Sequence, residues 1–416
     1  MQLYHGDIVY AENTDALTVV EDGYVAVENG LVEGVYGAVP ETLRGAPIQD
    51  HGRALIIPAF SDLHVHASQY IQRGVGMDLL LSDWLNTYTF PQEANFKDMS
   101  YAAPIYDAYV EDMVRHGTMH ACVFTTIHGE SAGYLADRMA ERGLYGLVGK
   151  VNMDTGSPDY LCETVEGSLR ETESFLERHS GHGTVRPILT PRFAPTCTAE
   201  LLKGLGALGK KYHVGVQTHL VESRWEAAEA LRLFPDCHSD AEIYERAGLL
   251  GNGPAVFAHV IFPSEEDLRI LKACGGMAVH CPDATNNIIA GIMPIATLRD
   301  AGVTLAMGSD IGGGHGIAVY KQVARAIQLS KMKEFYEPGL GKTIALPEAF
   351  YMATKAGGSA FGKVGSLEPG YHFNALVIDG MEDAGHAMSP EKRLERFCYI
   401  GDDRNIVARY LDGRAI

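Results

Sequence analysis

Polar and apolar positions alternate along short segments over the first 57 residues. DIVYAE and ALTVVEDGYVAVENGLVEGVYG are examples, and the second contains an Asn-Gly pair. Alternation with a period of two is typical of a strand that buries one face, and Asn-Gly favours a tight hairpin turn. The pattern therefore predicts antiparallel strands over residues 1–57.

After residue 57, apolar runs of strand length alternate with longer helical patterns such as YLADRMAERG and ESFLERHS. This alternation is typical of βα units that form a parallel sheet. Eight strand-like runs can be counted, which are LIIPAFSDLHVH, HACVFTTIH, YGLVGKVNMD, VRPILTPRF, VGVQTHLVE, AVFAHV, GMAVHCP and VTLAMGSD.

Nearly every run ends in a polar or ionisable residue. The residues are His66, His128, Asp154, Arg192, Glu222, His259, His280 and Asp310. A TIM-like (β/α)8 barrel builds its active site at the carboxyl ends of its strands, so the pattern predicts such a barrel over residues 58–365. A doubly wound open sheet is the alternative, but it does not need polar groups at the ends of so many strands.

The alternation of strand and helix stops near Gly365. GSLEPGYHFNALVID predicts a turn followed by a strand, and NIVARYLDGRAI predicts a further strand. We expect residues 1–57 and 366–416 to form one small β-sandwich, with the barrel inserted between its two halves. A chain of 416 residues has room for a large barrel and an accessory domain of this kind.

The net charge of −19 makes polyanionic partners unfavourable, so we expect neither a nucleic-acid partner nor an anionic membrane surface. No apolar run approaches the roughly 20 residues of a membrane helix, and the first 20 residues lack the cationic start of a secretory signal. Seven scattered cysteines without a C-x-x-C pair indicate a reduced protein. These features together predict a cytoplasmic protein.

His64 and His66 stand two positions apart at the end of the first run. Residues i and i+2 of a strand point to the same side, so both imidazoles should face the barrel mouth. Two hydrogen-bonded core histidines are the alternative, because an H-x-H pair alone is a weak metal signal. Further strand ends strengthen the metal interpretation, because they add His219, His259 and Asp310.

Imidazole and carboxylate together suit Zn²⁺, and Fe²⁺ accepts the same donors. His64, His66, His219 and Asp310 would complete the protein ligands of one ion, and water would take the remaining position. A second metal would need a bridging lysine or glutamate, but the fourth run ends in TPRF. Lys150 in the third run is therefore expected to be structural.

Glu222 lies three residues after His219, where a carboxylate could shuttle protons beside an activated water. Asp310 could also accept the proton of that water, and His259 could hold the water in line. A surface glutamate is the alternative for Glu222. We expect His128 and His280 to support the site from behind its ligands.

At these residues the chain resembles the amidohydrolase superfamily and, within it, the guanine deaminases. The segments that carry the resemblance are HASQY, WLNTYTFPQEANF, GKVNMD, TPRF, THLVES, AVHCP, GSDIGGG and GDDRNI. They span nearly the whole chain. The H-x-H, TPRF and GDDRN blocks are specific only in combination.

The resemblance implies a zinc-dependent hydrolase that converts guanine to xanthine and ammonia in purine catabolism or salvage, and it suggests a homodimer. The implied ligands are His64, His66, His219 and Asp310, with Glu222 as proton shuttle and His259 beside the attacking water. It further implies that Gln69, Arg192 and Phe193 hold the purine base. Arg192 can offset charge on the ring carbonyl, Phe193 offers apolar surface to a flat base, and Gln69 can donate and accept.

The chain departs from the family after the seventh run, where HCPDATNN replaces a pattern close to HCPxSN. Because this loop should cover the barrel mouth, a pterin, an 8-oxopurine or a triazine stays open as the substrate. A non-catalytic assembly protein on the same barrel is a third hypothesis, but such a protein is not expected to keep all four metal ligands.

Overall fold

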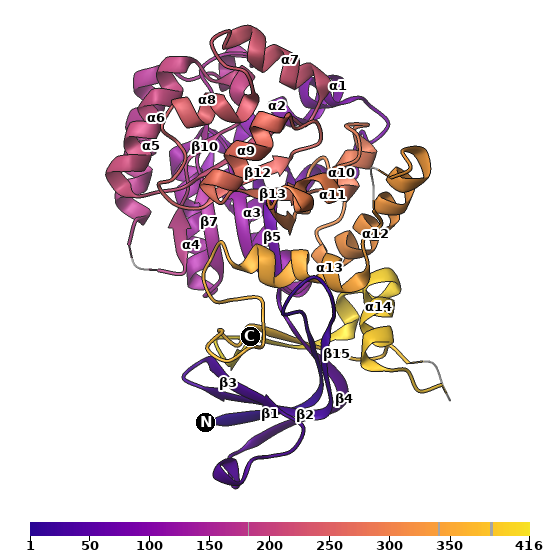
Figure 1. Ribbon diagram of the computed structural model, residues 1–416. Coiled ribbons are helices and arrows are strands. Elements are labelled where there is room, and N and C mark those ends of the chain that lie inside the picture. The colour runs from indigo at the N-terminus through magenta and orange to yellow at the C-terminus, as the bar shows by residue number, and fades with distance from the viewer. Residues whose placement is uncertain (182, 340–341, 383–385) are drawn as a thin grey trace.

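The computed structural model describes residues 1–181, 183–339, 342–382 and 386–416. Two parts are visible in Figure 1. Helices surround strands in the upper part, whereas the lower part contains strands from both ends of the chain and both termini.

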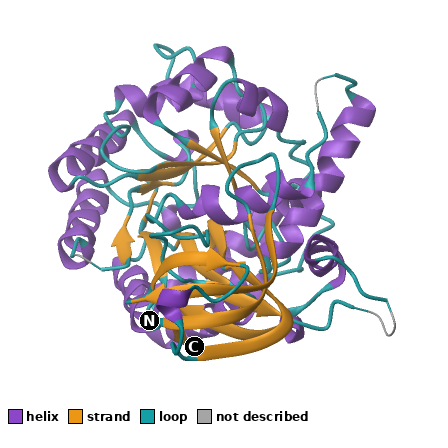
Figure 2. Cartoon of the chain, turned by 60° about the horizontal axis from the view of Figure 1, so that its bottom comes forward, coloured by secondary structure: helices purple, strands orange, loops and turns teal. Residues whose placement is uncertain are grey.

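One seven-stranded sheet joins the two ends of the chain in the order β17-β16-β15-β4-β1-β2-β3, and of its neighbouring pairs only β1 and β4 run parallel. Its strands are β1 (Gln2–Tyr10), β2 (Thr18–Glu28), β3 (Leu31–Tyr36), β4 (Ile48–Pro58), β15 (Ala375–Ile378), β16 (Ile406–Leu411) and β17 (Arg414–Ala415). Figure 2 shows the strands curving beside both termini. The predicted meeting of the two ends is therefore found, whereas their division into the two layers of a sandwich stays a prediction.

The hairpin between β2 and β3 turns at Asn29 and Gly30. Both residues have a positive φ, 52° and 82°. Two consecutive left-handed residues are what a two-residue hairpin turn requires, and Asn and Gly adopt them at low cost. The local sequence thus predicted this turn correctly.

A helix that the pattern did not predict lies between β15 and β16. α14 (Pro390–Ile400) buries Leu394 and Phe397. The Phe397 ring lies 4.4 Å from the ring of Tyr320 on α12 (Val319–Tyr336), between centroids. The segment between the two predicted strands therefore holds a helix that the sequence pattern did not indicate, because this amphipathic segment packs against a helix distant in sequence.

The upper part contains two four-stranded parallel sheets. The first is made of β5 (Phe60–His66), β6 (Thr118–Phe124), β7 (Tyr145–Gly149) and β9 (Val185–Pro187). The second is made of β11 (Val216–Leu220), β12 (Ala255–His259), β13 (Met277–His280) and β14 (Thr304–Met307). A short parallel pair, β8 (Val151–Asn152) and β10 (Thr190–Pro191), extends the C-terminal side of the first sheet.

Backbone hydrogen bonds cross both seams between the two four-stranded sheets. At one seam Gln217 N donates to Leu189 O at 2.9 Å, and at the other Asp310 N donates to His64 O at 2.8 Å. This arrangement is of the TIM-barrel type, in agreement with the predicted α/β class. Closure into one continuous eight-stranded ladder stays a prediction.

The first strand-like run, LIIPAFSDLHVH, is divided between the two parts of the molecule. Residues up to Pro58 pair within the terminal sheet as β4, and β5 begins at Phe60. Ala59 N donates to Asn374 O at 2.9 Å between them. The predicted boundary between residues 57 and 58 lies inside this run, but the count of the whole run as one barrel strand is wrong, because residues on both sides of Ala59 pair in different sheets.

Helices follow most strands of the upper part. The longer ones are α3 (Met99–Arg115), α4 (Gly129–Glu141), α5 (Val165–His179), α6 (Ala199–Tyr212), α7 (Arg224–Leu233), α9 (Glu265–Cys274) and α12. The shorter ones are α1 (Leu81–Trp84), α2 (Phe90–Ala94), α8 (Asp240–Arg246), α10 (Pro282–Asn287), α11 (Ile295–Asp300) and α13 (Leu346–Tyr351). Short 3-10 turns include η2 (Ala67–Gln72), η4 (Asn95–Lys97) and η6 (Ala194–Thr196), and π-helical turns are η3 (Leu85–Thr89) and η7 (Met352–Ala356).

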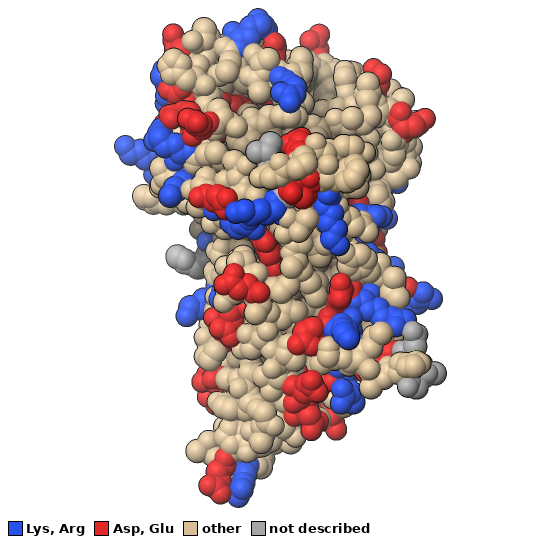
Figure 3. Space-filling view, turned by 45° about the vertical axis from the view of Figure 1, so that its right-hand side comes forward, with Lys and Arg blue, Asp and Glu red and all other residues tan. Residues whose placement is uncertain are grey.

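Acidic and basic side chains are interspersed on the face that Figure 3 shows, without a continuous basic surface there. The prediction against a polyanionic partner stays a prediction. Within the described ranges, no helix combines the length and the apolar character needed to span a bilayer.

A buried ion pair joins α14 to the terminal sheet, and we expect its loss to lower the stability of the protein. Arg393 donates to the carboxylate of Asp7 on β1, and Asp7 also accepts from the backbone of Asp22 at 2.7 Å. Replacing Arg393 with Met leaves a buried carboxylate without its main partner, so we expect the free energy of unfolding to fall by about 3–5 kcal/mol. Urea unfolding followed by circular dichroism measures this change.

Arg404→Met is the control, because the side chain of Arg404 is 85% exposed and pairs with Asp402 at the surface. Its loss should change the free energy of unfolding by less than about 1 kcal/mol. Equal effects of the two substitutions would contradict the structural role of the pair.

Candidate functional site

Four histidines and one aspartate from distant strands meet at the carboxyl ends of the two parallel sheets. His64 and His66 end β5, His219 lies in β11, His259 ends β12, and Asp310 follows β14. The ring centroid of His64 lies 4.9 Å from that of His66, 4.8 Å from that of His219 and 5.2 Å from that of His259. The predicted convergence of these residues is present in the structure.

The donor atoms of these residues form two overlapping groups that could hold a metal ion. One group contains His64, His66 and His219, and the other contains His64, His259 and Asp310. The donor atoms within each group lie within 4.8 Å of one another. Nε2 of His64 is 3.2 Å from Oδ1 of Asp310, and Nε2 of His66 is 3.2 Å from Nε2 of His219.

Burial makes these imidazoles suitable as neutral ligands. It lowers the pKa of His64 to about 3 and that of His66, His219 and His259 well below the usual value. Nε2 of His64 is buried without a hydrogen-bond partner among the described residues. A buried polar atom of that kind is costly unless something binds it. Neutral nitrogens beside a carboxylate fit a divalent cation such as Zn²⁺.

Groups behind the candidate ligands orient them. Nδ1 of His219 lies 2.6 Å from the backbone oxygen of Arg192, so Nδ1 carries the proton and Nε2 presents its lone pair. Asp62 accepts from the backbone and the hydroxyl of Ser309 at 2.9 and 2.5 Å, next to Asp310. Sequence reasoning missed Asp62, although it shares the period-two face of His64 and His66.

Glu222 lies just beyond β11, beside His259, with its Oε1 3.5 Å from His259 Nε2. Burial, together with the negative charge of Asp310, raises the pKa of Glu222 to about 8. The carboxyl is therefore protonated near neutral pH, as a proton donor must be. The surface alternative for this residue is wrong, because only 8% of the residue is exposed.

Two further buried carboxyl groups hold the turn that carries Glu222. Glu226 accepts from the backbone N–H of Glu222 at 2.8 Å, and Asp240 accepts from that of Val221 at 3.3 Å. Val221 has a φ of 44°, which is strained for a β-branched residue. Both hydrogen bonds stabilise this conformation. Nothing in the local pattern of α7 and α8 marked these two carboxyl groups as part of the site.

The residues predicted to hold a flat base lie beside the metal residues. Arg192 and Gln69 are both buried, and each donates to the carboxylate of Glu93 on α2. The ring of Phe193 lies 6.4 Å from that of His219, between centroids. Glu93 was missed, although its segment WLNTYTFPQEANF carries part of the family resemblance.

The other polar residues in or after the predicted strands make different contacts. Asp154 accepts from the backbone and hydroxyl of Thr198 at the start of α6, at 2.8 and 2.5 Å. His128 precedes α4, four residues after β6 ends. Lys150 is buried and its Nζ lies 2.5 and 2.6 Å from the two carboxylate oxygens of Glu163. His280 is buried, and its charge would lower the pKa of His259, but neither of its ring nitrogens has a hydrogen bond among the described residues.

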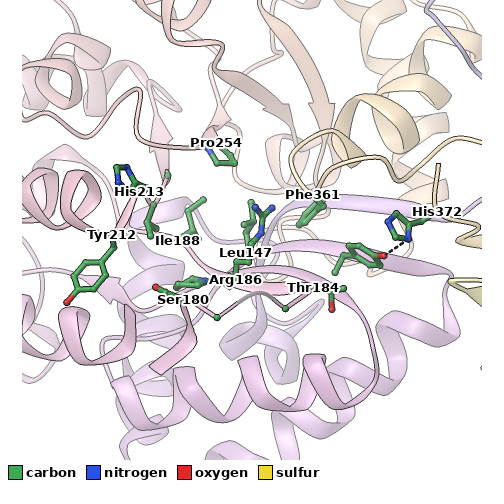
Figure 4. Close-up of a pocket in the computed structure, with 16 residues that line it drawn as sticks. Leu147, Ser180, Thr184, Arg186, Ile188, Tyr212, His213, Pro254, Phe361 and His372 are labelled. Atoms are coloured by element: carbon green, nitrogen blue, oxygen red, sulfur yellow. Dashed lines mark hydrogen bonds between the residues drawn. The ribbon is translucent and has the colours of Figure 1, made fainter. Parts of the chain in front are cut away.

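A cavity of about 520 Å³ opens at the other end of the first sheet and of β11. Figure 4 shows Arg186, Ile188, His213 and Phe361 around it, and Tyr145 Oη lies 3.0 Å from Nδ1 of His372. None of the predicted site residues lines this cavity. It is therefore separate from the candidate metal centre.

Comparisons with known proteins agree with this geometry. The model of the Amidohydrolase family matches residues 55–416. A guanine deaminase of Dictyostelium discoideum is 35% identical over 88% of this chain and 83% of its own length, and that of Escherichia coli is 30% identical over 97% and 93%. A crystal structure of guanine deaminase from C. acetobutylicum with guanine in the active site is 41% identical, has a TM-score of 0.97, and covers 100% of this chain and 99% of its own.

The imidazole cluster predicts the effect of a ligand substitution on metal content. Loss of a residue that only orients a metal ligand weakens metal binding about 10- to 100-fold, so loss of a ligand should cost at least as much. We expect His219→Ala to lower bound zinc and iron per chain at least about tenfold, measured by mass spectrometry of the elements after desalting. His116→Ala is the control, because His116 contacts Asp112 on α3 instead. Full metal content in the His219 variant would rule out the assigned cluster.

Proposed function

The chain belongs to the amidohydrolase family, and from that premise we propose that it catalyses the hydrolytic deamination of guanine to xanthine and ammonia. It is a hydrolase that acts on C–N bonds. The observation that carries the proposal is the similarity over the full chain to a guanine deaminase with bound guanine, at 41% identity. The arrangement of buried donors supports the same chemistry.

We propose that His64, His66, His219 and Asp310 hold one divalent cation, Zn²⁺ or Fe²⁺, because their donor atoms converge and their imidazoles are neutral. When bound, the cation would supply the Lewis acidity that makes water nucleophilic at neutral pH. All other steps belong to side chains of this chain.

The proton transfers are assigned from position. Asp310 accepts a proton from the water that attacks C2, and His259 orients that water, since its Nε2 is 3.5 Å from Glu222 and 3.8 Å from Asp310. Glu222 donates its proton to ring N3. As the C2–N bond breaks, Asp310 passes the proton that it took from water to the amino group, which leaves as ammonia. The remaining hydroxyl proton on C2 passes to the carboxylate of Glu222, so the oxygen from water remains as the C2 carbonyl of xanthine and both carboxyl groups return to their starting states.

Substrate recognition is assigned to Gln69, Arg192 and Phe193. The guanidinium of Arg192 can stabilise negative charge on the ring carbonyl during attack. Phe193 can pack against the flat base, and Gln69 can bind a ring edge. All three lie beside the imidazole cluster, in η2 and between β10 and β11.

We further propose two domains, a β-sandwich of residues 1–57 and 366–416 and a closed (β/α)8 barrel of residues 58–365. The mixed terminal sheet and the hydrogen bonds across both seams support these bounds. Finally, we propose that the protein is a cytoplasmic homodimer and that it serves purine catabolism or salvage.

Substitution of Glu222 tests the proton shuttle. Glu222→Gln keeps the size of the side chain but removes the transferable proton, so we expect kcat on guanine to fall about 10²- to 10⁴-fold with metal content unchanged. Ammonia release measures the rate. Glu229→Gln on α7, the helix that follows Glu222, is the control, because Glu229 pairs with Arg232 at the surface. Wild-type turnover by the Glu222 variant would refute this role.

A substrate panel tests the identity of the ring. Asp283, where the chain departs from the family pattern, accepts from Gln322 Nε2 at 2.8 Å and pairs with Arg325 at 3.3 Å, so its carboxylate is engaged with α12. We therefore expect guanine to exceed pterin, 8-oxoguanine and an aminotriazine in kcat/KM by about tenfold or more. A higher kcat/KM for any of the other three would reassign the substrate.

A further inference from the structure

One buried carboxylate joins the two polar residues that hold the purine edge in the proposed function. Glu93 is 1% exposed and lies in α2. Its Oε1 accepts from Nε2 of Gln69 at 2.9 Å, and its Oε2 accepts from Nη1 of Arg192 at 2.6 Å. Each oxygen of the carboxylate therefore holds one of the two side chains.

The contact with Glu93 determines which end of the Gln69 amide is available. An amide can present either an oxygen or an N–H group, but an ionised carboxylate can only accept. Gln69 must therefore turn its Nε2 toward Glu93. Among the described residues, Oε1 of Gln69 has no hydrogen-bond partner, and it lies so close to Gly312 that a Cβ there would be 2.0 Å away. Gly312 has a φ of 135°, a region that also favours glycine.

The same contact determines what Arg192 can offer. Nη1 of its guanidinium is used by Glu93, and its Cζ lies 5.6 Å from the ring centroid of Phe90 on α2. The side-chain hydrogen bond found for Arg192 among the described residues uses Nη1, which leaves Nε and Nη2 as donors for a substrate.

The segment that carries Glu93 is tied to the turn that carries Gln69. Nε2 of Gln72 in η2 donates to the hydroxyl of Thr89 at 2.8 Å, directly before α2. Thr89 and Gln72 are both buried. This second contact fixes the position of η2 relative to α2, so that Glu93 contacts Gln69 in one orientation.

We propose that Glu93 is a positioning residue that sets the order of acceptor and donor presented to the substrate edge. It makes Gln69 an acceptor beside Arg192 as a donor. This order is complementary to a ring edge with an N–H beside a carbonyl, such as N1–H and C6=O of guanine, and it opposes an edge with a bare ring nitrogen. The proposal rests on the proposed function and assigns its substrate preference to a residue that need not touch the substrate.

The first test compares guanine with 2-aminopurine, which has the same leaving amino group but lacks N1–H and the carbonyl. In Glu93→Gln the new amide can donate to Gln69 and accept from Arg192, which allows the Gln69 amide to turn over. We expect kcat/KM for guanine to fall at least about tenfold, and the guanine to 2-aminopurine ratio of kcat/KM to fall by a similar factor. A general defect in folding or catalysis would lower kcat/KM for both substrates by the same factor and leave their ratio unchanged.

The second test exchanges the two side chains in the variant Q69E/E93Q. The exchanged pair keeps one carboxylate and one amide, and the carboxylate at position 69 can only accept. We expect the exchange to restore most of the guanine preference that E93Q alone loses. If E93Q does not fold, Q69E/E93Q still tests the proposal. A folded Q69E/E93Q variant without preference for guanine would contradict it.

Glu163→Gln is the matched control, since Glu163 is also a carboxylate that pairs with a buried cation, Lys150, outside the candidate site. Its guanine to 2-aminopurine ratio should equal that of the wild type. If the wild type deaminates guanine but E93Q keeps the wild-type ratio of kcat/KM for guanine to 2-aminopurine, the role proposed for Glu93 is wrong. A wild-type chain that releases no ammonia from guanine would instead overturn the proposed function.

Discussion

The structure depends on the convergence of neutral imidazoles and one carboxylate in a buried space. His64, His66 and His219 lose their usual basicity because water cannot reach them. An imidazole that stays neutral keeps a lone pair for a cation. Burial also raises the pKa of the Asp310 carboxyl, so its negative charge is favoured when a cation lies beside it. The same exclusion of water raises the pKa of Glu222, so one physical condition prepares both the candidate ligands and the proposed proton donor.

The parallel strands place these groups with little freedom. His64 and Asp310 come from strands at the seam between the two four-stranded sheets, and Asp310 N donates to His64 O across it at 2.8 Å. The backbone that joins the sheets thus also fixes the spacing between two candidate ligands. His219 is held in the same way, because its Nδ1 and its backbone N–H both contact the oxygen of Arg192, at 2.6 and 3.2 Å.

Buried carboxyl groups support the site from behind. Asp62 holds the segment before Asp310, Glu226 holds the backbone of Glu222, and Glu93 holds Gln69 with Arg192. Each is nearly inaccessible to water, where an uncompensated carboxylate is costly. Each accepts hydrogen bonds from groups that must keep one orientation, so these buried carboxyl groups fix the geometry of the site.

The sequence by itself determined the features that depend on local periodicity. The H-x-H spacing puts His64 and His66 on one side of a strand, Asn29-Gly30 makes a hairpin turn, and polar residues at the ends of apolar runs mark the end of the parallel sheets where the candidate site lies. Only the tertiary structure decided that the terminal sheet keeps the first run up to Pro58, that residues 390–400 form a helix, and that Glu93 joins Gln69 to Arg192. These features arise from contacts between segments far apart in the chain, such as Glu93 and Arg192, which are 99 positions apart. Such contacts produce no periodic pattern in the local sequence, because each residue is stabilised by a partner that is adjacent only in the folded structure.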